Sequence, residues 1–372
     1  MANKPRVLVA MSGGIDSSLA AVLLHEQGYD LVGMTMKTWD YAQSGGAKKE
    51  TGCCSLDSIN DARQVAVQLG FAHYILDIRE EFGQDVINYF TGEYLDGRTP
   101  NPCVMCNTHI KWDALLRRAD MLGCDLIATG HYAHLNEAGG RYYISKGNDA
   151  QKDQSYALWG VSQESLRRTI FPLAGMRKSE IKAMAAEKGF LDLVNKSESY
   201  EICFVPDNDY RGFLKRQDPA LQARVAGGEF VLRDGTVVGQ HEGYPFYTIG
   251  QRKGLGVALG FPAYVVDIQK ETNRVVLGPL DSMHKNAMRV SRLNYMKYAE
   301  VPPDGLRCVA KIRYNHEGTG ATLLPAGPDA LDVWFDEPVF AIAPGQSAVF
   351  YEGNDVIGGG WIMKAWNQEI QS

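Results

Sequence analysis

Residues 6–18 read Arg-Val-Leu-Val-Ala-Met-Ser-Gly-Gly-Ile-Asp-Ser-Ser. The apolar run at the start is typical of a buried parallel strand, and the paired glycines that follow permit a tight turn. Ser17–Gln27 then reads as a helix that ends at Gly28. A strand, a glycine turn and a helix in this order indicate an α/β domain, in which the helix begins at the carboxyl end of a strand.

The same alternation continues through the first half of the chain. Strands are expected at Leu31–Met36, His73–Ile78 and Asp125–Thr129, with helical stripes of apolar residues between them. We therefore expect a parallel sheet that is covered by helices on both faces. Ligands of such sheets bind at the carboxyl ends of the strands, so the loops after Met11, Met36 and Thr129 should converge on one site.

The pattern changes after about residue 206, where short β-branched runs and turn residues replace the helical stripes. Phe230–Leu232 and Val237–Gly239 flank an Asp-Gly turn and predict a hairpin, and strands continue from Ala287 to the end. We predict an α/β domain over residues 1–206, a small β-rich central domain over residues 207–284 and a C-terminal β-barrel over residues 285–372.

Composition excludes several classes of protein. The 372 residues are 45% hydrophobic, and 44 acidic against 38 basic side chains give a net charge of -6. These values exclude a disordered tail and a collagen-like chain, and they argue against a protein that coats DNA. Seven scattered cysteines indicate intracellular thiols rather than a disulfide framework. Since no apolar run approaches about 20 residues and no presequence is visible, we expect a soluble cytoplasmic protein.

The string Ser-Gly-Gly-Ile-Asp-Ser-Ser at residues 12–18 predicts an anion site. Backbone N–H groups and serine hydroxyls there can bind phosphate oxygens, and Asp16 can hold a magnesium ion or a lid loop. The motif of a Walker loop is absent, so cleavage at a γ-phosphate is not indicated. The string resembles the pyrophosphatase-type loop of ATP enzymes that adenylate a substrate, and an ordinary glycine turn is the alternative.

Cys103 and Cys106 form a Cys-x-x-Cys pair, which can be half a zinc site, a redox pair or a nucleophile with its neighbour. Prolines beside the pair predict a loop, followed by a helix from about Thr108 whose dipole lowers the pKa of Cys106. The alternative is that both cysteines are buried and act only as small hydrophobic residues. On spacing alone, Cys203 is interpreted as a cysteine of the hydrophobic core. Gly130 lies at the end of a predicted strand, where the absence of a side chain permits the close approach of a nucleotide.

Taken together and in this order, the motifs resemble the tRNA-uridine 2-sulfurtransferase family MnmA (tRNA-specific 2-thiouridylases), over nearly the whole chain. The strings that carry the resemblance are Met-Ser-Gly-Gly-Ile-Asp-Ser (11–17), Asn-Pro-Cys-x-x-Cys-Asn (101–107), Ala-Thr-Gly-His-Tyr (128–132), Lys-Asp-Gln-Ser-Tyr (152–156), Glu-Ile-Cys-Phe (201–204), Gly-Gln-Arg-Lys-Gly-Leu-Gly (250–256), Arg-Tyr (313–314) and Pro-Gly-Gln-Ser-Ala-Val-Phe (344–350). The set is specific, because only the first string is shared with the wider loop superfamily.

The resemblance implies ATP-dependent formation of 2-thiouridine at the wobble position of tRNA. Adenylation of the uridine C2 oxygen precedes attack by a persulfide on Cys203, with Cys106 as the partner nucleophile. The implied ATP site, with Mg²⁺, consists of Ala10, Met11, Ser12, Gly13, Gly14, Ile15, Asp16, Ser17, Met36 and Gly130. The implied tRNA contacts are Asn101, Pro102 and Cys103 around the flipped base, and His131, Lys152, Asp153, Gln154, Arg313, Tyr314 and Gln346 elsewhere.

The implied partners are the anticodon region of tRNA and a persulfide donor derived from a cysteine desulfurase, acting directly or through a carrier protein. Neither DNA nor a membrane is expected as a partner, and no resident metal site is expected. Arg252 and Lys253 are further candidates for contact with tRNA. The alternative is that they are only the basic tip of a hairpin.

One position departs from the family pattern: Cys103 stands where some members carry an Asp with an acid/base role. A thiol can accept a proton only as a thiolate, and three thiols at 103, 106 and 203 are an alternative ligand set for an iron–sulfur cluster. Cys53, Cys54, Cys124 and Cys308 are expected to be bystanders. The rival functions are an ATP-pyrophosphatase that amidates a small molecule and a nonenzymatic tRNA- or nucleotide-binding protein.

Overall fold

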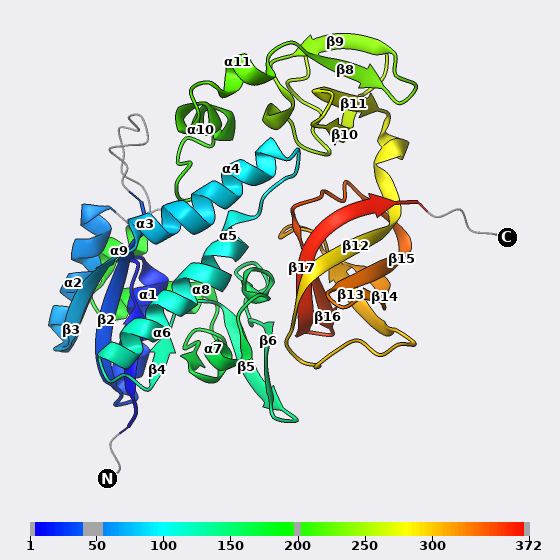
Figure 1. Ribbon diagram of the computed structural model, residues 1–372. Coiled ribbons are helices and arrows are strands. Elements are labelled where there is room, and N and C mark those ends of the chain that lie inside the picture. The colour runs from blue at the N-terminus through cyan, green and yellow to red at the C-terminus, as the bar shows by residue number, and fades with distance from the viewer. Residues whose placement is uncertain (1–3, 40–54, 197–201, 368–372) are drawn as a thin grey trace. The chain divides into compact units, whose positions relative to one another are not determined.

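The structure is a computed structural model that describes residues 4–39, 55–196 and 202–367 (Figure 1). The chain forms two compact units. Unit 1 consists of residues 1–86, 103–209 and 354–356, and unit 2 consists of residues 87–102, 210–353 and 357–372. Among the described residues, no helix is both long enough and apolar enough to cross a membrane. Cys53 and Cys54 lie outside the described residues.

Unit 1 is built on a five-stranded parallel sheet, which confirms the predicted fold class of the first domain. The strands are β1 (Arg6–Ala10), β2 (Asp30–Lys37), β3 (Ala72–Asp77), β4 (Leu126–Ala128) and β7 (Thr169–Ile170). Their order in the sheet is β3-β2-β1-β4-β7. Because the chain runs outward from β1 in one direction and resumes at β4 in the other, the topological switch point lies between β1 and β4.

Helices cover both faces of this sheet. Val7 and Val9 point into a core that they share with α1 (Ile15–Glu26) and α8 (Lys178–Glu187). Leu8 faces the opposite side, since alternate residues of a strand point to opposite faces, and there α6 (Trp112–Met121) packs on β1 and β4. Unit 1 also contains α2 (Leu56–Leu69), α3 (Arg79–Phe82), α7 (Gln163–Arg167), α9 (Leu191–Asn195), the 3₁₀ turn η4 (Ser155–Leu158) and an antiparallel hairpin of β5 (Ala133–Ala138) and β6 (Arg141–Lys146).

The Cys-x-x-Cys segment is helical, so the prediction of a loop before a helix from about Thr108 is wrong. A four-residue helix α5 (Pro102–Met105), a π-helical turn η3 (Cys106–Lys111) and α6 follow one another without a break. Pro102 can begin a helix because its φ is already helical and its missing N–H would have no partner there. Cys103 therefore lies in the first helical turn, and Cys106 lies inside the helical run, where the dipole argument for its pKa does not apply.

Unit 2 contains the two β regions expected after residue 206. Its smaller sheet has the order β10-β11-β8-β9, and six further strands in the order β12-β15-β14-β13-β16-β17 close into a barrel, because β12 also pairs with β17. The strands are β8 (Gly228–Leu232), β9 (Val237–His241), β10 (Tyr264–Gln269), β11 (Arg274–Gly278), β12 (His284–Tyr295), β13 (Leu306–Lys311), β14 (Thr319–Gly327), β15 (Ala330–Phe340), β16 (Ser347–Glu352) and β17 (Asp355–Trp366). Short 3₁₀ turns η5 (Tyr244–Phe246) and η6 (Leu280–Met283) connect them. The domain limits at residues 206 and 284 stay a prediction.

Three helices complete unit 2 as far as the structure describes it. They are α4 (Asn88–Leu95), which follows the π-helical turn η2 (Gly83–Ile87), and α10 (Tyr210–Gln217) and α11 (Leu221–Val225), which the sequence did not predict. The rings of Phe90 and Phe213 meet edge to face at 5.7 Å, and those of Tyr94 and Tyr210 stack at 4.6 Å. Although α4 precedes residue 206 in the chain, it packs in unit 2.

Candidate functional site

The loop between β1 and α1 is held in one conformation. Gly13 has φ of +68°, and a Cβ there would lie 1.9 Å from the carbonyl oxygen of Ser58, so no other residue fits. The Ser12 N–H donates to Ser17 Oγ at 3.0 Å, and the Ser17 hydroxyl donates to the Gly14 carbonyl at 3.1 Å. The exposed Ser12 side chain and the first turn of α1 offer hydrogen-bond donors, because the first N–H groups of a helix have no partner within it. The binding of an anion there stays a prediction.

Gly130 brings the loop after β4 against the same helix. A Cβ at residue 130 would lie 2.8 Å from the Ser17 nitrogen and 2.9 Å from the Asp16 carbonyl carbon. Since both are backbone atoms, they cannot move aside, and only glycine permits this approach. The structure thus brings loop 12–18 and Gly130 together at the switch point of the sheet. Met36 is partly exposed near the end of β2, a neighbour of β1.

Asp16 is paired inside the protein. Lys178 Nζ donates to both of its carboxylate oxygens at 2.7 Å, and the Tyr132 hydroxyl donates to Oδ1 at 2.6 Å. Lys178 is 8% exposed, whereas the Asp16 side chain is 33% exposed, so the carboxylate neutralises a buried ammonium group. In the part of the chain that the structure describes, no group of three or more His, Cys, Asp or Glu side chains is arranged to hold a metal ion.

A second lysine ties the loop to α2. Lys196 Nζ donates to the Gly13 carbonyl at 3.1 Å, to Ser58 Oγ at 2.9 Å and to Asp61 Oδ2 at 2.6 Å. Sequence reasoning missed both Lys178 and Lys196. Their partners are far away in the chain, so no local spacing identifies either residue.

Cys106 and Cys203 both belong to unit 1, where Cys106 is buried and Cys203 is partly exposed. Phe204, next to Cys203, packs edge to face on Phe82 of α3 with ring centroids 5.7 Å apart. The same helix α3 also contacts η3, which begins at Cys106. One short helix therefore brings the segments of the two cysteines to the same region of unit 1.

Burial favours the uncharged forms of both Cys103 and His131. Burial lowers the pKa of His131 to about 3, with a smaller effect of Lys111, so its imidazole is neutral near pH 7. Its Nδ1 is hydrogen-bonded to Thr129 Oγ1 at 2.8 Å. Desolvation by the surrounding protein raises the pKa of the Cys103 thiol even though this side chain reaches solvent, and Lys111 opposes the shift. A thiol with a raised pKa stays protonated near pH 7, so Cys103 does not accept a proton as a carboxylate would.

Two of the predicted tRNA contacts in unit 1 take part in bonds within the protein. Asp153 Oδ1 accepts from the N–H groups of Gly147 and Ser155 at 3.1 and 3.2 Å. Gln154 Oε1 accepts from the Tyr132 N–H at 3.1 Å. These bonds shape the loop beside Tyr132, and the neighbouring Lys152 is partly exposed.

Other predicted tRNA contacts lie in unit 2. Arg313 donates to the Phe340 carbonyl at 3.1 Å, and the adjacent Tyr314 is 46% exposed. Gln346 donates to the carbonyls of Thr99 and Pro100, and the next residues, Asn101 and Pro102, also belong to unit 2. The contact of each of these residues with tRNA stays a prediction.

Comparison with known proteins decides the family. Residues 5–207 match the family described as tRNA methyl transferase HUP domain, residues 213–279 match the tRNA methyl transferase PRC-barrel domain and residues 285–362 match the Aminomethyltransferase beta-barrel domain. A protein of Cytophaga hutchinsonii named tRNA-specific 2-thiouridylase MnmA is 68% identical over 369 residues, which cover 99% of this chain and 100% of that protein. The chain belongs to the MnmA family. The motif resemblance is thereby confirmed.

Further relatives of the same name agree with this assignment. Those of Amoebophilus asiaticus and Salinibacter ruber are 66% and 57% identical, and the matches cover 98% and 100% of this chain and 97% and 98% of theirs. A solved U34-tRNA thiolase NcsA from Methanococcus maripaludis with its [4Fe-4S] cluster is 20% identical, with a TM-score of 0.35 over 59% of this chain and 69% of that one. A likeness that distant gives no information about the chemistry of an MnmA-family chain.

Proposed function

We propose that this protein is an ATP-dependent tRNA-uridine 2-sulfurtransferase that thiolates C2 of the wobble uridine. One observation carries the proposal: a phosphate-type loop at residues 12–18 and the two cysteines Cys106 and Cys203 belong to the same unit, with α3 in contact with the segments of both cysteines. An amidating enzyme or a binding protein needs no such pair of thiols. The names of the relatives supply the substrate, tRNA, and the product, 2-thiouridine.

ATP fits the cradle formed by Ala10–Ser17, Met36 and Gly130. The glycines leave space for phosphates, and the N-terminus of α1 favours their negative charge. Because Lys178 occupies both oxygens of Asp16, Mg²⁺ would be held mainly by the phosphates and by water, as is usual for this ion. When bound, it neutralises charge on the leaving pyrophosphate.

The reaction begins with activation of a poor electrophile. The C2 oxygen of uridine attacks the α-phosphorus of ATP, the bond to pyrophosphate breaks, and the oxygen becomes part of a good leaving group, AMP. The terminal sulfur of a persulfide on Cys203 then attacks C2. The Cys106 thiolate attacks the inner sulfur, so that the persulfide S–S bond breaks, AMP leaves, and a C=S group and a Cys106–Cys203 disulfide remain.

The cycle needs two co-reactants. An external dithiol reduces the disulfide, and a persulfide donor derived from a cysteine desulfurase, direct or through a carrier protein, reloads Cys203. The target base leaves the anticodon stack to enter the site, where Asn101, Pro102 and Cys103 line it. In this proposal the rest of the tRNA is contacted by His131, Lys152–Gln154, Arg313, Tyr314 and Gln346. The reaction takes place in the cytoplasm.

Mass spectrometry of the wobble nucleoside tests the proposal, with ATP, tRNA and a persulfide donor present. Cys203→Ser should abolish 2-thiouridine while tRNA-dependent pyrophosphate release continues, because adenylation precedes sulfur transfer. Cys124→Ser is the matched control, since Cys124 is a buried thiol of the same unit that no step uses.

Three outcomes contradict this proposal in different ways. Full thiolation by Cys203→Ser overturns the persulfide route, and loss of thiolation only in preparations without iron supports a cluster instead. Absence of any tRNA-dependent pyrophosphate release favours a binding protein.

A further inference from the structure

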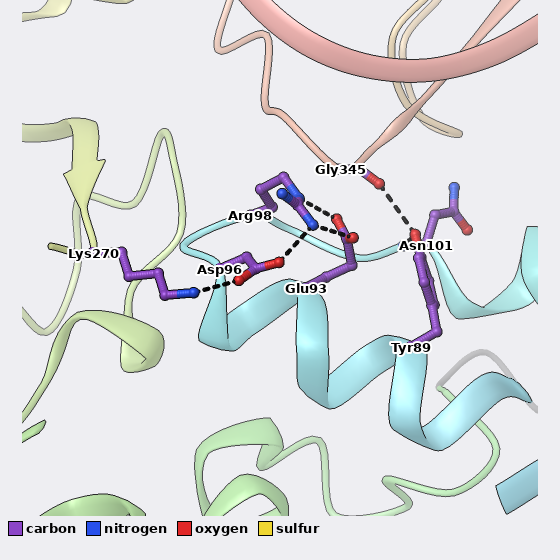
Figure 2. A network of polar contacts seen from close by, with 7 residues as sticks. All are labelled: Tyr89, Glu93, Asp96, Arg98, Asn101, Lys270 and Gly345. Carbon is purple, nitrogen blue, oxygen red and sulfur yellow. Dashed lines mark hydrogen bonds and ion pairs between the residues drawn. The ribbon is translucent and has the colours of Figure 1, made fainter. Parts of the chain in front are cut away.

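A half-buried ion pair in unit 2 folds the chain back at the end of α4. Figure 2 shows Glu93, on the helix, facing Arg98 in the segment that follows it. Arg98 Nε donates to Glu93 Oε2 and Arg98 Nη2 donates to Oε1, both at 2.7 Å, and the Arg98 N–H donates to the Glu93 carbonyl at 2.8 Å. Glu93 is only 7% exposed. A bidentate pair with a buried carboxylate fixes orientation as well as charge.

Asp96 connects this pair to the smaller sheet of unit 2. Arg98 Nη2 also donates to Asp96 Oδ2 at 2.9 Å, and Lys270, which directly follows β10, donates to Asp96 Oδ1 at 2.6 Å (Figure 2). The hydrogen bond from Lys270 lowers the pKa of the Asp96 carboxyl, so Asp96 is ionised at neutral pH. Four charged side chains thus hold the first residues after α4.

The barrel holds the next residues through the loop at 344–346. The Thr99 N–H donates to the Pro344 carbonyl at 2.8 Å. Gln346 Nε2 donates to the carbonyls of Thr99 and Pro100 at 3.2 and 2.8 Å. These contacts add three hydrogen bonds between the barrel loop and the two residues that precede Asn101.

Tyr89 and Gly345 complete the attachment. The Tyr89 hydroxyl accepts the Asn101 N–H and donates to the Gly345 carbonyl, both at 3.4 Å (Figure 2). Gly345 has φ of +89°, and a Cβ there would lie 2.8 Å from Glu93 Oε2 and 2.8 Å from the Thr99 carbonyl oxygen. Only glycine lets the barrel loop approach the ion pair this closely.

The attached residues lead directly into the cysteine helix. Asn101 is followed by Pro102, where the helical run that carries Cys103 and Cys106 begins. Because that run is continuous, a shift of its first residue displaces both cysteines.

We propose that Glu93 and Arg98 are positioning residues for sulfur transfer. They hold residues 96–101 on the barrel loop and on Lys270, and thereby fix the backbone from which the cysteine helix starts. This inference rests on the proposed function. A misplacement of about 1 Å that arises far from the reacting atoms can lower a rate about 100-fold, so a remote ion pair can control the chemistry.

Glu93→Gln tests the proposal, since it keeps the shape of the side chain and removes its charge. Arg98→Lys is a milder second variant that keeps the charge and loses the bidentate geometry. Asp332→Asn is the matched control, because Arg289 and Asp332 form a similar bidentate pair at 2.7 and 2.8 Å between β12 and β15 of the barrel. Three quantities are measured on the full chain: hydrogen–deuterium exchange of residues 96–106, the single-turnover thiolation rate with saturating ATP and tRNA, and the Kd for tRNA.

For Glu93→Gln we expect faster exchange at residues 96–101, a thiolation rate lowered about 10- to 100-fold and a tRNA Kd within about threefold of the original value. Arg98→Lys should show the same changes at smaller size, and Asp332→Asn should show none of them. Equal thiolation rates for Glu93→Gln and Asp332→Asn overturn this inference and leave the proposed function standing. A weaker tRNA affinity with an unchanged thiolation rate has the same consequence. If the unmodified protein does not thiolate tRNA, the proposed function fails, and this inference fails with it.

Discussion

Lys178 donates one hydrogen bond to each carboxylate oxygen of Asp16, at 2.7 Å in both cases. Asp16 lies in the first turn of α1, beside the loop that we assign to the phosphates of ATP. A carboxylate there repels a polyanion unless a cation cancels its charge. The buried ammonium of Lys178 therefore makes the loop neutral toward its ligand.

Lys178→Met should weaken ATP binding by about tenfold or more, because the Asp16 carboxylate is then uncompensated near the phosphates. AMP, with fewer charges, should lose less affinity than ATP. The double variant Asp16→Asn with Lys178→Met removes both charges and should recover most of the loss. Calorimetric titration with each nucleotide measures these affinities, and equal losses for ATP and AMP would contradict the electrostatic explanation.

Gly130→Ala should lower ATP affinity at least about tenfold, since the added methyl group meets backbone atoms of Asp16 and Ser17 at 2.8–3.1 Å. The loop after β4 must then move away from α1, which opens the cradle. Gly83→Ala is the matched control, because a Cβ at residue 83 meets nothing within 4 Å. Nucleotide titration of both variants provides the test, and similar affinities would show that the close approach of Gly130 is unnecessary.

Gln346→Glu distinguishes two roles of one residue. Its amide donates to the carbonyls of Thr99 and Pro100, and a carboxylate in its place would face two acceptors with no proton to donate. If the residue mainly positions residues 99–101, single-turnover thiolation should slow about tenfold or more while tRNA affinity changes little. If it mainly contacts tRNA, the Kd should rise instead. Filter binding and single-turnover assays on the same preparation separate these outcomes.

Acid should destabilise the smaller sheet of unit 2 through His241. Burial lowers the pKa of His241 to about 4, and its Nδ1 accepts the Gly243 N–H at 3.0 Å, which requires the unprotonated nitrogen. The unfolded chain binds this proton near pH 6.5, so the free energy of unfolding should fall as pH drops from about 6.5 toward 4. Its contribution is about 1–3 kcal/mol. In urea titrations at several pH values, His241→Gln should reduce the fall of the unfolding free energy with decreasing pH. An unchanged fall would mean that other groups cause the acid sensitivity.

The sheet of unit 1 and the barrel of unit 2 could be predicted because their signals are local. Buried strands, glycine turns and alternating β-branched residues appear within a few positions of one another. The helical start at Pro102 was misjudged because proline indicates a loop as readily as the first residue of a helix. Lys178 and Lys196 could not be found, since each joins loop 12–18 only through contacts between distant parts of the chain.

The packing of α4 determines how this protein could be recombined with its relatives. Phe90 and Tyr94 are buried against aromatic rings of α10, so a fragment that ends at residue 206 would leave them without those partners. A chimaera joined at residue 206 would combine α4 of one parent with α10 and barrel loop 344–346 of the other. Exchange of unit 2 between homologues therefore requires residues 87–102 to be exchanged with it, as a separate segment inserted within the first 206 residues.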